Sequence, residues 1–151
     1  MDAPPRLPNV PSGPPSDPPS DPPSLAPVVP LLRLEGAVLF AAAVAAFAWT
    51  GAPWWWFVGL LLAPDLSAAG YLRGPRLGAR VYNAAHTTAA PAATAVAGLL
   101  FDLPALLAVA SIWAAHVGLD RALGYGLKLP ASFQATHLGP IGRARRRRQD
   151  G

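Results

Sequence analysis

Two imidazoles and two carboxylates are the side chains of this sequence best suited to chemistry. His116 and Asp120 lie four residues apart, so a helix would place both on one face. Both fall where an apolar segment meets its charged end, which is an expensive environment for ionisable groups. Asp65 and His86 occupy comparable positions in two earlier apolar segments. Because imidazole nitrogens and carboxylate oxygens bind divalent metals, the first hypothesis is a metal site shared by several helices.

The elements that would position these side chains are apolar. Hydrophobic residues make up 52% of the 151 residues and charged residues only 13%, a composition too apolar for an ordinary soluble domain of this size. The sequence contains no Cys, which excludes disulfides, thiol catalysis and thiolate metal ligands. Pro and Ser dominate residues 1–30 and Arg dominates residues 143–151, so the folded part is expected at 31–142.

Residues 1–30 are predicted to form a disordered tail. A Pro-Pro-Ser-Asp unit repeats with a period of four between Pro14 and Ser24. Pro removes backbone donors and fixes φ, and apolar residues are too few there to offset the entropy of ordering. We favour a spacer role for this tail over a role as an SH3-type ligand.

Four apolar segments are long enough to cross a hydrocarbon core of about 30 Å at about 1.5 Å per residue. We therefore expect an all-α membrane protein, a bundle of four transmembrane helices over residues 31–49, 54–72, 79–100 and 105–123. Pro64 should kink the second helix directly before Asp65. The third segment is built of Ala, Thr and Gly, which allow close approach, so it is expected at the centre of the bundle.

The basic residues predict the orientation in the membrane. All twelve Lys and Arg fall before or at the start of the first segment, in a predicted loop between the second and third, or from Arg121 onward. By the positive-inside rule, both termini and the loop of Arg73, Arg76 and Arg80 are cytoplasmic, in what we expect to be the bacterial cytoplasmic membrane. After the fourth segment we expect an ordered juxtamembrane loop.

A run of basic residues closes the sequence. We favour its role as a topology determinant over nucleic-acid binding, and contact with anionic lipid is a further role open to it. The run consists of Arg145, Arg146, Arg147 and Arg148.

The predicted orientation places the ionisable side chains at a common depth. Asp65 lies roughly 10 Å and His86 roughly 9 Å from the cytoplasmic ends of their segments, at about 1.5 Å per residue. His116 lies about 6 Å deeper than Asp120, and Glu35 sits just inside the first segment. Acids and imidazoles from four helices are therefore expected in one layer.

Three interpretations of this layer remain open. In a metal site, His86, His116 and Asp120 would bind a divalent ion such as Zn or Mn. Asp65 would then bridge to the ion or act as the base for a bound water. In a proton or ion pathway, acids and imidazoles would relay protons beside the proline kinks. In a purely structural protein, the acids would pair with Arg and lock the helix packing.

Four further residues are expected to support the site. Asn83 and Thr87 share a helical face with His86, and His137 in the juxtamembrane loop could cap the cluster from the cytoplasmic side. For Glu35, pairing with a nearby Arg is favoured over a direct role.

Five motifs in order make the sequence similar to a known membrane family. They are Leu32–Gly36, Ala63–Ser67, Tyr82–Thr87, His116–Lys128 and Thr136–Arg143. Together they resemble the bacterial membrane family catalogued as domain of unknown function 4260, over residues 31–143. The resemblance implies an integral membrane protein and carries no established activity.

A fainter resemblance is to membrane-bound metal-dependent hydrolases. Those enzymes also carry a Pro-Asp, a His-Thr or His-Ser, and a His-x-x-x-Asp on successive helices. The matching motifs here are Pro64-Asp65, His86-Thr87 and His116 to Asp120. A second acid or His tends to follow the first Asp in those enzymes, whereas Leu66-Ser67 follows it here. The resemblance implies a hydrolase acting on a lipid-like or phosphorylated substrate, and a structural or proton-coupled component without catalysis is the alternative.

Overall fold

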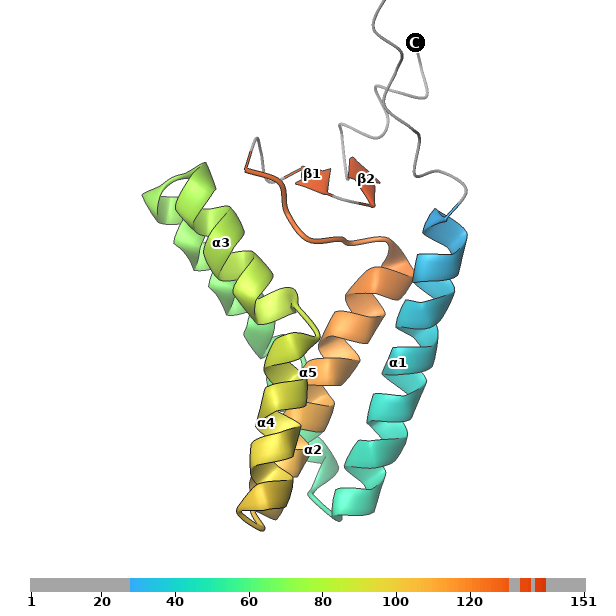
Figure 1. Ribbon diagram of the computed structural model, residues 1–151. Helices are drawn as coiled ribbons and strands as arrows, with labels where there is room; N and C mark the ends of the chain where they lie inside the picture. The colour runs from blue at the N-terminus through green and yellow to red at the C-terminus, as the bar shows by residue number, and fades with distance from the viewer. Residues whose placement is uncertain (1–27, 131–133, 137, 141–151) are drawn as a thin grey trace, which may run out of the picture.

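The computed structural model describes residues 28–130, 134–136 and 138–140. Predictions for the proline-rich head up to residue 27, for His137 and for the basic tail lie outside these residues. The described chain is almost entirely helical, with a short hairpin after the last helix (Figure 1). Its elements are α1 (Val29–Thr50), α2 (Trp54–Leu60), η1 (Ala63–Arg73), α3 (Pro75–His86), α4 (Ala89–Leu100), α5 (Pro104–Leu123), β1 (Ala135–Thr136) and β2 (Gly139–Pro140).

The predicted all-α membrane bundle is confirmed. Three helical stretches are long and apolar enough to cross a membrane, namely Val29–Thr50, Trp54–Arg73 and Pro104–Leu123. The shorter α4 is also apolar. Many large apolar side chains on these helices are exposed, among them Val58, Leu62 and Leu99. Such a surface is typical of helices that face lipid.

The predicted kink at Pro64 is present as a break between two helices. α2 ends at Leu60, and η1 begins at Ala63 and continues as a 3₁₀ helix. Pro64 has no N–H to donate to the carbonyl of Leu60 four residues earlier, so the α-helical hydrogen bonding is interrupted at this point. The break sets the direction in which Asp65, in the first turn of η1, leaves the backbone.

The predicted basic loop between the second and third segments is wrong. α3 begins at Pro75 and already contains Arg76 and Arg80, so Gly74 alone separates it from η1. Pro is well suited to the first position of a helix because its φ is already helical. Gly74 has a φ of 117°, which only glycine adopts readily, and the chain reverses there.

The third segment is likewise not one helix, contrary to the prediction. α3 ends at His86, Thr87 is extended (φ −79°, ψ 145°), and α4 begins at Ala89. The reason lies in Pro91, which cannot donate to the carbonyl of Thr87 four residues earlier. The polar face that starts at Asn83 therefore stops at His86 and does not continue along α4.

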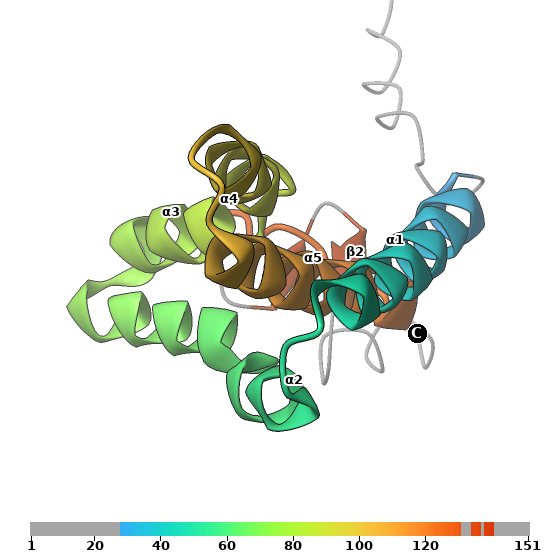
Figure 2. The ribbon, with the colours of Figure 1, turned by 90° about the horizontal axis from the view of Figure 1, so that it is seen from below.

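The centre of the bundle is occupied by α5, not by the third segment as predicted. α5 packs against α1, α4 and α2, whereas α3 packs mainly against η1. The two views agree that α1 lies beside α5 and that η1 and α3 form a separate pair (Figures 1 and 2). Near the end of α1, Phe47 packs with Phe57 of α2 and Ile112 of α5 in the apolar core.

Two glycines bring α1 and α5 into backbone contact. A Cβ on Gly36 would lie 2.7 Å from the backbone nitrogen of Ala122, and one on Gly118 would lie 2.6 Å from that of Phe40. Small residues at such positions let membrane helices approach closely. This contact fixes the rotation of α5, the helix that carries His116.

Candidate metal centre

Three separate elements contribute the four predicted side chains to one cluster. Asp65 comes from η1, His86 from the last turn of α3, and His116 and Asp120 from one face of α5. One ligand atom from each residue lies within 4.8 Å of all the others. The described residues thus contain an Asp/His group able to hold a metal ion.

The distances within this Asp/His cluster are short and similar to one another. The Nε2 atoms of His86 and His116 are 3.1 Å apart. Asp65 Oδ1 lies 3.4 Å from His86 Nε2 and 3.6 Å from His116 Nε2. Asp120 Oδ2 lies 3.7 Å and 3.8 Å from the same two nitrogens.

These separations match the edges of a small coordination polyhedron. Two ligand atoms bound to one tetrahedral zinc ion at about 2.0–2.1 Å from it lie about 3.3–3.4 Å apart. The five separations above, from 3.1 to 3.8 Å, bracket that value. The remaining separation, between the two carboxylate oxygens, is at most 4.8 Å, so the four side chains are able to hold a metal ion.

Hydrogen bonding orients His86 for this role. Its Nδ1 lies 2.9 Å from the carbonyl oxygen of Tyr82, which can only accept, so Nδ1 carries the proton. Its Nε2 lone pair then points into the cluster, as a metal-binding imidazole requires. The Tyr82 ring stacks on the His86 ring at 3.6 Å, and its hydroxyl donates to Asp120 Oδ2 at 3.3 Å.

His116 is held by packing. Its side chain is 2% exposed, and its Nδ1 has no hydrogen-bond partner within the described part of the chain. The two carboxylates differ in access, because the side chain of Asp65 is 48% exposed and that of Asp120 only 19%. Asp65 is therefore the member of the cluster that an incoming molecule meets first.

A buried lysine, which the sequence analysis did not select, lies beside the cluster. The Nζ atom of Lys128 lies 5.0 Å from the centre of the Tyr82 ring, the ring that also stacks on His86. Burial lowers the pKa of Lys128, and the charges of Asp120 and Asp65 oppose that shift. The cluster therefore has a cation close to its two acids.

Asn83 positions this lysine. Its side-chain oxygen accepts from the Lys128 backbone N–H at 2.7 Å, and its side-chain nitrogen donates to the Lys128 carbonyl at 2.9 Å. Lys128 also pairs with Thr136 in a β-bridge, which ties the hairpin to the loop after α5. Asn83, predicted as a supporting residue, thus contacts the loop instead of the cluster.

Two other predicted supporting residues lie away from the cluster. Glu35 is exposed and lines a different cavity together with Arg121, so its side chain is not part of the Asp/His cluster. The Arg33 guanidinium donates to the Ala122 carbonyl at 2.8 Å. Thr87 accepts from the backbone N–H of Ala89 through its hydroxyl and helps begin α4. Depth along a helix was predicted for these residues, but the side of the helix was not.

Sequence and structure comparisons bear on the identity of the chain. A family model described as Domain of unknown function (DUF4260) matches residues 30–141, well over half of the 151 residues. No curated protein and no solved structure matches the chain. The matched range contains the four residues of the Asp/His cluster together with Tyr82 and Lys128. The chain therefore belongs to the DUF4260 family, a family defined by a domain of unknown function.

Proposed function

We propose that this protein is a membrane-bound, metal-dependent hydrolase-like protein with one divalent ion at the Asp/His cluster. His86, His116 and Asp120 are its ligands, and Asp65 is either a fourth ligand or the base. The observation that carries the proposal is the approach of four ligand atoms from three elements to within 4.8 Å. Zn suits the mixed nitrogen and oxygen donors, and Mn is the second choice.

Charge balance supports a divalent ion. Two carboxylates and two neutral imidazoles carry a formal charge of about −2, which one divalent cation neutralises. Without a cation, two carboxylates this close together within a helix bundle repel each other and lose hydration. Lys128 then adds one positive charge next to a neutral centre, which favours an anionic substrate.

The chemistry expected of such a centre is hydrolysis. A bound divalent ion lowers the pKa of a coordinated water towards about 7. Asp65 is suited to take up a proton because it is the most exposed acid of the cluster and lies within 3.6 Å of both imidazoles. A lipid-like or phosphorylated substrate agrees with the apolar surroundings and with the nearby Lys128.

The alternative is a proton-coupled or structural role without catalysis. The contact of 3.1 Å between the Nε2 atoms of His86 and His116 favours it, because one imidazole can donate directly to the other. Asp65 would then pass the proton between this pair and solvent. Such a site has no need of a metal, and metal content separates the two functions.

The proposed orientation places the cluster towards the cytoplasm. The start of α1, the turn between η1 and α3, and the end of α5 lie at the same end of the molecule (Figure 1). This end carries Arg33, Arg76 and Arg121. The positive-inside rule assigns such an end to the cytoplasm, with four segments crossing the bacterial cytoplasmic membrane.

Elemental analysis of the purified full chain tests the proposal. We expect about one Zn or Mn per chain, as a single site predicts, and loss of the metal in His116→Ala and Asp120→Asn. Asp102→Asn is the matched control, because Asp102 is an exposed acid in the turn at the other end of α4. Asp65→Asn should keep the metal if Asp65 is the base and lose it if Asp65 is a ligand. Wild-type protein without a stoichiometric metal would rule out the metal centre and favour the alternative.

A further inference from the structure

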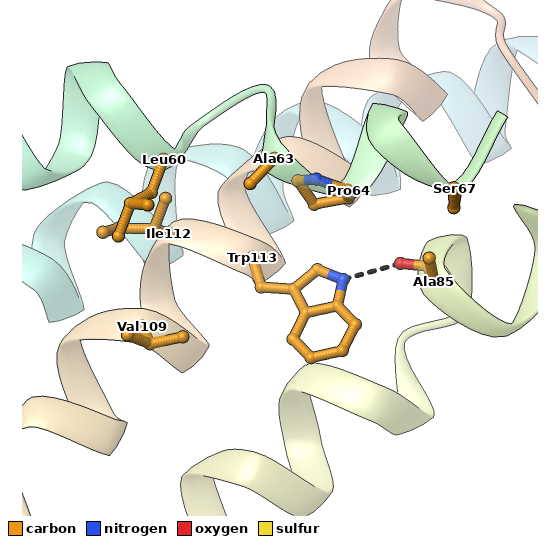
Figure 3. Close-up of a pocket in the computed structure, with 8 residues that line it drawn as sticks. All are labelled: Leu60, Ala63, Pro64, Ser67, Ala85, Val109, Ile112 and Trp113. Atoms are coloured by element: carbon orange, nitrogen blue, oxygen red, sulfur yellow. Dashed lines mark hydrogen bonds between the residues drawn. The ribbon is translucent and has the colours of Figure 1, made fainter. Parts of the chain in front are cut away.

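An apolar cavity lies next to the Asp/His cluster. It has a volume of about 330 Å³ and is formed by α2, η1, α3 and α5 (Figure 3). Its lining residues are Leu60, Ala63, Pro64, Ser67, Ala85, Val109, Ile112 and Trp113. None of these lining side chains carries a charge. The volume falls within the usual range for small-molecule pockets, about 300–1,000 Å³.

The cavity and the cluster share the same three elements. Pro64 immediately precedes Asp65 in η1, and Ala85 immediately precedes His86 in α3. On α5, Trp113 lies one turn before His116, or about 4.5 Å along the helix axis. Each of the three elements that carry the cluster therefore also lines the cavity, through a residue within three positions of a cluster residue.

A hydrogen bond holds this boundary in place. The Trp113 indole N–H donates to the carbonyl oxygen of Ala85 at 2.6 Å (Figure 3). This bond crosses from α5 to α3 and leaves the apolar face of the indole ring to line the cavity. It satisfies a backbone acceptor close to the end of α3, where the break at Thr87 leaves carbonyls without helical partners.

Two residues that line the cavity are exposed on a helical stretch able to span a membrane. Leu60 is 40% exposed and Ala63 is also exposed, and both lie in the helical stretch Trp54–Arg73, which is able to span a membrane. A molecule dissolved in the bilayer can therefore reach the cavity from the side. The apolar end of such a molecule would remain in apolar surroundings as it moves from the bilayer into the cavity.

We propose that this cavity binds the hydrocarbon chain of a lipid whose anionic head group lies at the Asp/His cluster. A volume of about 330 Å³ is of the size that small-molecule pockets have, so it is large enough for part of a hydrocarbon chain. The inference rests on the proposed function, because the metal and Lys128 provide the positive charge for the head group. It specifies the substrate class as a single-chain amphiphile, or one chain of a larger lipid.

Photo-crosslinking in detergent solution tests this inference. The probe is a palmitic acid with a diazirine in its chain, bound to the full-length protein and competed with unlabelled palmitic acid. We expect saturable labelling of the peptide that contains Val109 and Trp113. Ala63→Phe should reduce it about tenfold, because the phenyl ring would occupy part of the cavity, and a tenfold loss of affinity corresponds to about 1.4 kcal/mol of lost binding. Val109→Phe should act in the same way from the opposite wall.

The matched control is Ala69→Phe. Ala69 is also an exposed alanine of η1, and it does not line the cavity. Helical content and monodisperse elution identify any variant that fails to fold. Labelling that does not saturate, that survives both cavity variants, or that falls equally in Ala69→Phe overturns the inference.

The position of the head group needs a second probe. A diazirine-bearing hexadecanol has a comparable chain but no charge, so the acid should bind more tightly than the alcohol, and a chelator should abolish that preference. Equal binding of acid and alcohol to metal-loaded protein refutes a head group at the cluster. Metal content measured on the same samples keeps the two proposals distinct. A stoichiometric metal without saturable labelling contradicts only the proposal that the cavity binds a lipid chain. Saturable labelling without a metal contradicts both the metal centre and the placement of the head group at the cluster.

Discussion

The contact between α1 and α5 predicts the effect of one added methyl group. In Gly118→Ala, the new Cβ would lie 2.6 Å from the Phe40 backbone nitrogen, 2.8 Å from the Gly36 carbonyl oxygen and 3.0 Å from the Phe40 Cα. All three atoms belong to the backbone of α1, so no side chain can rotate to make room. The two helices must separate or slide.

The cost follows from two opposing effects. Overpacking of a tight contact costs about 1–3 kcal/mol, whereas replacing a helical glycine with alanine gains about 0.5–1 kcal/mol. Because the obstructing atoms are backbone, we expect a net loss of about 1–2 kcal/mol, within the usual overpacking range. For chains of about 150 residues, this loss lowers the melting temperature by about 2–8 °C.

The matched control is Gly59→Ala in α2. A Cβ on Gly59 would meet nothing within 4 Å, so this substitution gains helix propensity without a clash. Its melting temperature should stay the same or rise, whereas that of Gly118→Ala should fall. Thermal unfolding in detergent, followed by circular dichroism, measures both.

The same variant reports on the candidate site. Gly118 lies two residues from both His116 and Asp120, so a displaced α5 moves two of the four ligand atoms. Metal affinity should fall in Gly118→Ala and remain unchanged in Gly59→Ala. If Gly118→Ala has the melting temperature and the metal affinity of the wild type, then the α1–α5 contact does not position the site, and the prediction is wrong.

Two further predictions concern Lys128 and the topology. Burial lowers the pKa of Lys128 below its ordinary value of 10.5, so its charge penalises the folded state until the pH rises through the folded pKa. The stability of the wild type should therefore rise with pH relative to Lys128→Met in the alkaline range below 10.5, and parallel melting profiles would contradict this. The sequence lacks Cys, so Ala52→Cys and Ser24→Cys each introduce a unique thiol. A membrane-impermeant maleimide added to intact cells should label position 52 only. Labelling of position 24 instead would show that the orientation is the opposite of the predicted one.

Much of the architecture could be predicted because it depends on simple rules. Apolar length predicted four spanning segments, of which the structure has three as helices long enough to cross a membrane, and the missing N–H of Pro64 predicted the kink before η1. The same rule predicted a kink at Pro91, but the uniform Ala, Thr and Gly composition still suggested one segment there. The structure has two helices, with a break at Thr87.

The cluster was harder to predict in detail. Depth along the helices correctly grouped Asp65 with the two imidazoles, but it also included Glu35, which the rotation of α1 directs elsewhere. Tyr82 could have been found, because it lies four residues before His86 on the same face of α3. The position of Lys128 depends on a non-local pairing with Asn83, which no periodicity in the sequence reports.

The two proline breaks explain why the cluster forms where it does. Asp65 follows the break between α2 and η1, and His86 precedes the break between α3 and α4, so both residues lie at the ends of the η1–α3 pair. This pair is packed within itself, where Tyr71 covers Gly78 and Val81 contacts Gly70. At its inner end it is tied to α5 by the Trp113 hydrogen bond and by the cluster. A metal at the cluster would therefore join the η1–α3 pair to the α1–α5 pair. Its removal should loosen the first pair as a unit and leave the glycine contact of the second intact.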